Sequence, residues 1–128
     1  MADVFEGKSI LIVDDDPDIV TAIETALADT SATVASARDG ITAVNLAEDN
    51  DPDLVVLDIM LPKKSGFLVR EKIRKGKVKG SKPKVVMITG NQGMRHKQYA
   101  ETLGVDAYIN KPFAMDVLID EIIQLLGD

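Results

Sequence analysis

Five polar residues that could act together in chemistry each follow a short apolar stretch of the chain. They are three carboxylates, a hydroxyl and an ammonium: Asp14, Asp15, Asp58, Thr89 and Lys111. Two like charges about 4 Å apart repel by roughly 4 kcal/mol at an effective dielectric near 20, so grouped carboxylates need a cation. A hard divalent ion such as Mg²⁺, with Lys111 neutralising charge and Thr89 donating a hydrogen bond, would make a site for a phosphoryl group.

Each of these residues alone also has a simpler interpretation. Acids that follow a strand often cap the next helix, and this is the role we favour for Asp16. Thr89 alone is typical of a turn at the end of a strand, and Lys111 alone is typical of a surface lysine. A zinc site is not indicated, because the chain has no cysteine and its one histidine, His96, lies elsewhere in the sequence. Only the joint placement of the five residues favours a site.

The apolar stretches predict the strands that would position these residues. Continuous runs rich in β-branched residues at 10–13, 54–57 and 85–88 are typical of strands buried on both faces of a parallel sheet. Weaker runs at 32–35 and 107–109 predict strands nearer the edges. Since the carboxyl ends of parallel strands share one edge of a sheet, the five residues should meet in one cleft.

Segments with helical periodicity separate the predicted strands. Asp16 can cap the first helix, and Pro17 suits its first position. A second helix should follow Asp39, a third should cover 67–74, and a less regular fourth should cover 92–103. The apolar faces expected for the first, second and last helices are Ile19, Ile23, Ala26 and Leu27; Ala43, Val44 and Ala47; and Val117, Leu118, Ile122 and Leu125.

The alternation of strand and helix, repeated five times, predicts an α/β fold with helices on both faces of the sheet. The length of 128 residues and 45% hydrophobic content suit one compact domain over 1–128 with a core at about 8–126, and we expect no output domain in this chain. The sequence shows no secretion signal and no apolar stretch long enough for a membrane span, and the lack of cysteine fits a reducing compartment. We therefore expect a cytoplasmic protein that does not bind membranes.

The net charge of −6 is unevenly distributed. Residues 63–84 hold ten of the fifteen lysines and arginines but only one acid, Glu71. This stretch is either a solvated helix and loop or a docking surface for an anionic partner. The acidic remainder argues against direct nucleic-acid binding by the domain.

Five motifs in order resemble the receiver domains of response regulators in two-component systems. They are Ile-Leu-Ile-Val-Asp-Asp-Asp-Pro at 10–17, Leu-Asp-Ile-Met-Leu-Pro at 57–62, Ser-Gly at 65–66, Ile-Thr-Gly at 88–90 and Tyr-Ile-Asn-Lys-Pro-Phe at 108–113. The resemblance covers nearly the whole chain. It implies a flavodoxin-like (βα)5 fold with the strand order 2-1-3-4-5.

The resemblance also implies which residues carry out the phosphoryl chemistry. Asp58 would be the phosphorylation site and would accept a phosphoryl group from a sensor histidine kinase or a histidine phosphotransfer protein. Asp15 would bind Mg²⁺ directly and Asp14 through water, with Asp58 and the backbone carbonyl of Met60 as the other protein ligands.

Three further residues are implied to transmit the change. Lys111 would pair with a phosphoryl oxygen, and its bond to Pro112 is expected to be cis. Thr89 would move toward the phosphoryl group, and Tyr108 would turn inward after it. The function implied is a signalling phosphoprotein that catalyses only its own phosphorylation and dephosphorylation and acts by changed binding to a downstream protein.

Some positions depart from the family pattern. Receivers of winged-helix transcription factors usually pair charges across a dimer, but here Ala107 and Val117 stand where acids are expected and Glu121 stands where an arginine is expected. We therefore expect the domain to be mostly monomeric. Ala114 stands where many relatives have a capping serine, which would add about 1 kcal/mol to the last helix.

Three alternatives remain beside a stand-alone regulator or phosphorelay shuttle. The chain could be a receiver fragment of a larger transcription factor. An aspartyl-phosphate hydrolase usually has a second catalytic aspartate two residues after the nucleophile, where this chain has Met60. A flavodoxin-like cofactor binder would need a phosphate loop rich in Gly, Ser or Thr after the first strand, and none follows Val13.

Overall fold

The fold is built on one parallel sheet whose strands were predicted from their apolar runs. The computed structural model describes residues 4–58, 83–89 and 105–127. Its strands are β1 (Ser9–Val13), β2 (Thr33–Ala37), β3 (Leu54–Asp58), β4 (Lys84–Thr89) and β5 (Ala107–Asn110). All neighbouring pairs are parallel, in the order β2-β1-β3-β4-β5. The flavodoxin-like order expected from the sequence is therefore confirmed.

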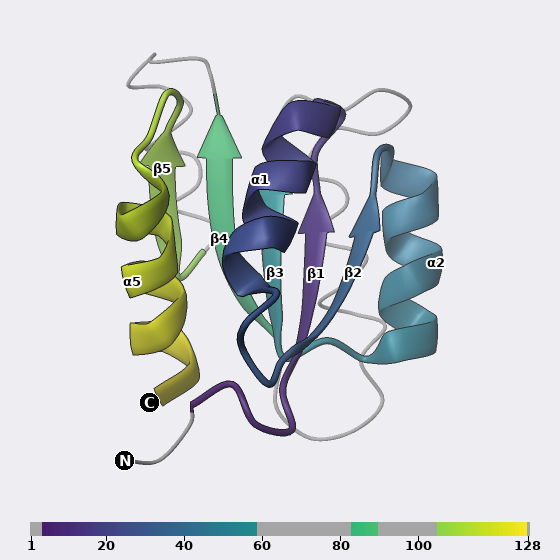
Figure 1. Ribbon diagram of the computed structural model, residues 1–128. Helices are drawn as coiled ribbons and strands as arrows, with labels where there is room; N and C mark the ends of the chain where they lie inside the picture. The colour runs from purple at the N-terminus through teal and green to yellow at the C-terminus, as the bar shows by residue number, and fades with distance from the viewer. Residues whose placement is uncertain (1–3, 59–82, 90–104, 128) are drawn as a thin grey trace.

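Three helices are described, and they cover both faces of the sheet. They are α1 (Pro17–Leu27), α2 (Gly40–Asn50) and α5 (Met115–Gly127). Figure 1 shows α1 and α5 in front of the sheet, and α2 next to β2, the outer strand on the side away from β5. Two of the expected helices, over 67–74 and 92–103, lie outside the described residues. The same holds for the basic stretch 63–84 except its last two residues.

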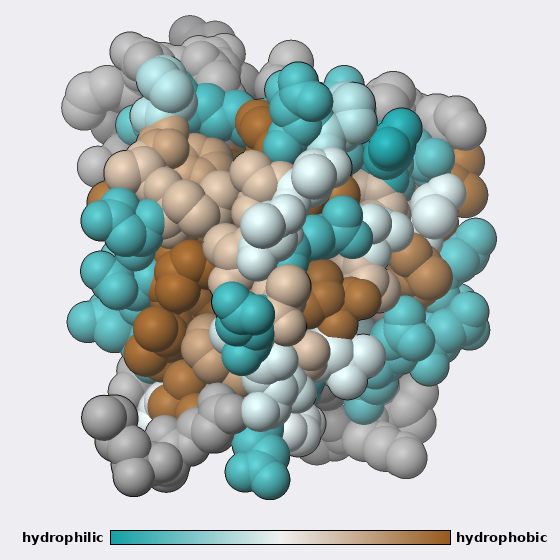
Figure 2. Space-filling model, viewed as in Figure 1, coloured by the Kyte–Doolittle hydropathy of each residue, from teal (hydrophilic) through white to brown (hydrophobic). Residues whose placement is uncertain are grey.

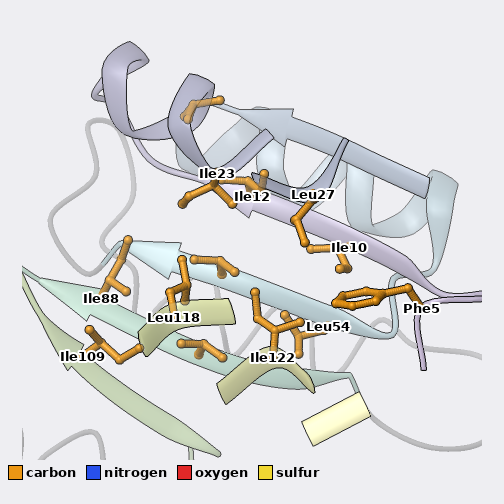
Figure 3. Close-up of a cluster of buried hydrophobic side chains, with 13 residues drawn as sticks. Phe5, Ile10, Ile12, Ile23, Leu27, Leu54, Ile88, Ile109, Leu118 and Ile122 are labelled. Carbon is orange, nitrogen blue, oxygen red and sulfur yellow. The ribbon is translucent and has the colours of Figure 1, made fainter. Parts of the chain in front are cut away.

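Alternation along the strands divides the core into two layers. Ile10 and Ile12 of β1 belong to the cluster beneath α1 and α5, whereas Leu11 and Val13 belong to the cluster beneath α2. Successive side chains of a strand point to opposite faces, so a continuous apolar run is buried on both sides. Figure 3 shows the first cluster, in which side chains of the central strands meet Leu118 and Ile122 of α5.

The helix faces differ in detail from those expected. Val20 is buried on α1 together with Ile23 and Leu27. Ile19 is partly buried and packs against the same cluster. On α5, Val117 is 49% exposed and therefore lies outside the buried face. Figure 2 shows apolar surface along α5 on the face viewed. Val117 and Ile123 are the exposed large hydrophobic residues of this helix. The described part of the chain contains no helix long and apolar enough to cross a bilayer.

The helix starts follow the capping residues in the sequence. The side chain of Asp16 accepts a hydrogen bond from the Asp18 N–H, with Pro17 at the first helical position, as predicted. Asp39 caps α2 in the same way, accepting from the N–H of Thr42 at 2.8 Å. The residue before α5 is Ala114, which has no side-chain oxygen to offer.

At the amino edge of the sheet, two aspartates join neighbouring strands. Asp53 precedes β3, and its Oδ2 accepts the N–H of Ser9 at 2.8 Å while its own N–H donates to the Ser9 carbonyl at 2.8 Å. Asp106 precedes β5 and is bonded to Val85 of β4 in the same two-way fashion, at 2.8 and 3.0 Å. Each carboxylate thereby satisfies a backbone donor at the start of a neighbouring strand.

Candidate functional site

The opposite, carboxyl edge of the sheet brings the predicted site residues together. Asp14 follows β1 directly, Asp58 is the last residue of β3, and Thr89 is the last residue of β4. Lys111 follows β5 directly, because β5 extends one residue beyond the predicted strand. In-register parallel pairing of β1, β3, β4 and β5 places these strand ends along one line.

Three carboxylates converge at this edge. Asp14, Asp15 and Asp58 each offer one oxygen, and these oxygens all lie within 4.8 Å of one another. Asp14 is 0% and Asp58 3% exposed, and within the described ranges they are the two buried charged residues. Asp15 is exposed to solvent. Buried carboxylates are unfavourable unless a cation or hydrogen bonds compensate them.

Asp14 is fixed by the backbone around it. Its Oδ1 accepts the N–H of Asp16 at 2.9 Å, and its own N–H donates to the Ala37 carbonyl at the end of β2 at 3.1 Å. The side chain that begins the acidic group therefore also shapes the turn into α1.

Lys111 is the cation that compensates the two buried acids. Its Nζ lies 2.9 Å from Oδ2 of Asp14 and donates a hydrogen bond to Oδ2 of Asp58 at 3.2 Å. The contact with Asp14 is an ion pair, since this oxygen has no hydrogen bond of suitable geometry within the described residues. Burial lowers the pKa of Lys111, but its close contacts with the carboxylates of Asp14 and Asp58 outweigh that effect, and the net pKa is raised.

The direct pairing of Asp14 with Lys111 was not predicted from the sequence. The sequence indicated that both residues lie at the same edge, and the family resemblance implied separate roles for them, Asp14 toward the metal and Lys111 toward the phosphoryl group. The expected cis bond between Lys111 and Pro112 is present.

The charge balance of the group suits a divalent cation. Three carboxylates and one ammonium leave an excess of about two negative charges at neutral pH. All the side-chain donors are carboxylate oxygens, which hard cations such as Mg²⁺ prefer, and Asp15 keeps the group open to water. The residues present therefore fit a magnesium ion.

The remaining predicted residues are placed only in part. Met60 lies outside the described residues, and for Thr89 only the strand position is described. Tyr108 packs against the cluster beneath α2, and its hydroxyl is already buried, with no hydrogen-bond partner in the described part of the chain. This burial raises the pKa of the phenol.

Comparison with known proteins gives a consistent result. Residues 10–123 match the family model of the response regulator receiver domain. The chain is 38% identical over 108 residues to the alkaline phosphatase synthesis transcriptional regulatory protein PhoP of Bacillus subtilis, covering 84% of this chain and 44% of that protein. It is 36% identical over 117 residues to the DNA-binding dual master transcriptional regulator RpaA of Synechocystis, covering 91% and 48%. The chain thus spans about half the length of these relatives.

Solved structures show the same likeness. A CheY-like receiver domain protein from Methanospirillum hungatei has a TM-score of 0.84 and 30% identity, with 94% of each chain covered. The receiver domain of a sensor histidine kinase from Pseudomonas aeruginosa, solved with a magnesium ion in its active-site cleft, has a TM-score of 0.82 and 29% identity, covering 95% of this chain and 99% of that one.

Proposed function

Because this chain belongs to the family of response regulator receiver domains, we propose that it is a phosphorylation switch whose acceptor is Asp58. The observation that carries the proposal is the environment of this carboxylate. It is 3% exposed, ends the central strand β3, and lies beside both the Lys111 ammonium and two further carboxylates. A buried nucleophile with a fixed cation on one side is suited to covalent phosphoryl transfer.

The proposed reaction forms an acyl phosphate on Asp58. A carboxylate oxygen forms the new P–O bond while the P–N bond of a phosphohistidine breaks, and the imidazole leaves with the electron pair of that bond. Lys111, now 3.2 Å from Oδ2 of Asp58, would neutralise a phosphoryl oxygen, and Thr89 would donate a hydrogen bond from the neighbouring strand end. Hydrolysis of the same acyl phosphate would reset the switch.

In the proposal, Asp14, Asp15, Asp58 and the Met60 carbonyl hold Mg²⁺. When bound, this ion supplies positive charge that offsets the charge of the transferring phosphoryl group. The convergence of three carboxylate oxygens supports this assignment. Asp14 is paired with Lys111, and a contact with the ion through water would leave that ion pair in place.

The proposed donor is a sensor histidine kinase or a histidine phosphotransfer protein, with the cytoplasm as the proposed location. We take residues 1–128 as one domain, because both core clusters share the same five strands. A receiver that belongs to a longer transcription factor is a second candidate. It is favoured by the two relatives named above, which are transcriptional regulators about twice as long as this chain.

We further propose that the phosphorylated domain remains mostly monomeric. A dimer through β5 and α5 would need complementary charges to fix its register. Ala107 and Val117 carry no charge, and Glu121 has the sign opposite to the family's arginine. Light scattering at micromolar protein, with Mg²⁺ and beryllofluoride as a phosphoryl mimic, should give the monomer mass. Twice that mass, abolished by Val117→Lys, would support the transcription-factor candidate instead.

Intact-mass measurement after incubation with acetyl phosphate and Mg²⁺ tests the phosphorylation site. The wild-type chain should gain the mass of one phosphoryl group, and Asp58→Asn should gain none. Asp53→Asn is the matched control, because it changes an aspartate at the other end of the same strand and should be labelled like the wild type. Full labelling of Asp58→Asn would refute the assignment.

A further inference from the structure

The two ends of the described chain meet at the amino edge of the sheet. Figure 1 shows the described N-terminal segment beginning beside the C-terminal end of α5, far from the edge that carries Asp58. Phe5 is 7% exposed and belongs to the core cluster that also holds Ile122 of α5. Figure 3 shows its ring beside Ile10, at the end of the cluster where Leu54 and Ile122 also lie. The segment is therefore packed into the core.

Val4 extends this contact to the last turn of α5. It packs against the same cluster as Leu125 and Leu126. A Cβ placed on Gly127 would lie 3.7 Å from Cγ1 of Val4, which is ordinary van der Waals distance. The end of α5 at Gly127 thus lies close to Val4 near the beginning of the chain.

A tight turn directs Val4 and Phe5 toward the helix. The N–H of Lys8 donates to the Phe5 carbonyl at 3.1 Å, and Gly7 has φ +73°. Since Gly7, and not Glu6, has a positive φ, the turn is of type II, which favours glycine at its third residue. The Lys8 carbonyl then accepts the N–H of Thr33 at 2.9 Å, which anchors the turn to the start of β2.

These residues lie outside the range matched by the receiver-domain model. The receiver-domain match covers residues 10–123, so neither the segment Val4–Lys8 nor residues 124–127 is part of it. We call the segment Val4–Lys8 the clasp.

We propose that the clasp fastens the far end of α5, so that movement begun at Lys111 on phosphorylation is confined to the near end of this helix. The confinement rests on the proposed function. Lys111 lies four residues before α5 begins and contacts Asp58 directly, so a change there acts on the first turn of the helix. The clasp holds the last turn against β1 and β3 through Val4 and Phe5. With the last turn held in this way, a shift of α5 would be largest at its first turn.

Amide hydrogen exchange of the intact chain tests the fastening. Val4→Ser should speed exchange at 122–127 by about tenfold, as expected for a local opening, and leave 10–13 and 54–57 unchanged. Val34→Ser is the matched control: Val34 packs against the same cluster but lies on β2, at the opposite edge of the sheet from α5. Equal acceleration at 122–127 in both variants would overturn the proposal.

Two further variants separate the clasp from general destabilisation. Gly7→Ala strains the turn without removing a side-chain contact, and it should speed exchange at 122–127 in the same direction as Val4→Ser. Gly127→Ala should slow exchange at 122–127 in both backgrounds, because alanine has the higher helix propensity. The slowing should be larger with Val4 present than in Val4→Ser, because only Val4 offers a methyl group for the added Cβ to contact. An equal gain in both backgrounds would mean that Val4 does not hold the helix end.

The same measurement with beryllofluoride and Mg²⁺ tests the confinement. In the wild type the mimic should change exchange at 111–118 but not at 122–127, and in Val4→Ser the change should reach 122–127. A wild-type change that runs through the whole of α5 would overturn the proposal. If the mimic changes the exchange rate of no amide, the result contradicts both the proposed function and the confinement. The fastening of the helix end is tested separately, by the variants without the mimic.

Discussion

Aspartates stand at both edges of the same sheet, in opposite situations. At the amino edge, Asp53 and Asp106 each accept a backbone N–H of a neighbouring strand at 2.8 Å. At the carboxyl edge, Asp14 and Asp58 are buried with one shared ammonium, and Asp15 adds a third negative charge. The first pair stabilises the sheet through hydrogen bonds, whereas the second group concentrates charge that only a bound cation can fully compensate.

We therefore expect substitutions at the two edges to have different effects. Changing an acid at the amino edge should lower stability and leave metal binding intact, whereas changing one at the carboxyl edge should do the reverse. The following measurements test this difference.

The largest effect expected is that of magnesium on the carboxyl edge. At a hundredfold excess over its dissociation constant, Mg²⁺ should raise the free energy of unfolding by about 2.7 kcal/mol relative to chelator. Asp15→Asn and Asp58→Asn should lose most of this gain, while Asp53→Asn should keep it. Urea unfolding at neutral pH measures the gain, and a wild-type curve that ignores Mg²⁺ would mean that the acidic group is not a cation site.

The amino edge should respond to loss of an acceptor. Asp53→Ala leaves the N–H of Ser9 without its 2.8 Å partner, which should lower the free energy of unfolding by about 1–3 kcal/mol. The exposed turn residue Asp29 provides the control, since Asp29→Ala should stay within about 0.5 kcal/mol of the wild type. Both variants are compared with the wild type in the presence of chelator. Equal losses of stability would mean that the hydrogen bond between Asp53 and Ser9 is not what stabilises the sheet.

The sign should reverse for the exposed acid of the carboxyl edge. In chelator, Asp15→Asn removes repulsion from Asp14 and Asp58 without removing a contact of Lys111, so unfolding should require about 1 kcal/mol more. Because Asp15 is exposed, added salt should reduce this gain. A loss of stability in Asp15→Asn at low salt would show that repulsion is not the dominant effect there.

The smallest effect concerns the helix starts at the carboxyl edge. Asp16 and Asp39 cap α1 and α2, but α5 follows Ala114, whose carbonyl accepts the N–H of Val117 at 3.1 Å and whose side chain offers no cap. Ala114→Ser should add about 0.5–1 kcal/mol to the free energy of unfolding. Ala114→Val, which adds volume without an oxygen, should not, and equal gains from both would exclude capping as the cause.

Several features of the fold could be predicted because they depend on neighbouring residues. The β-branched runs at 10–13, 54–57 and 85–88 specified the central strands, and Asp16 with Pro17 specified the start of α1. The helix faces were predicted less well. Val20 is buried more deeply than Ile19, and Val117 is exposed, because the angle at which a helix packs on the sheet decides which side of its apolar stripe is covered.

What the sequence by itself determined was the set of strands, their polar ends and the family to which those motifs belong. These depend on propensities and on motifs that are read within a few residues. Only the tertiary structure decided that Lys111 pairs with Asp14 as well as Asp58, that Asp53 and Asp106 join neighbouring strands, and that Val4 and Phe5 reach the end of α5. These contacts join residues far apart in the chain, and they depend on strand register and side-chain reach, which no local pattern encodes.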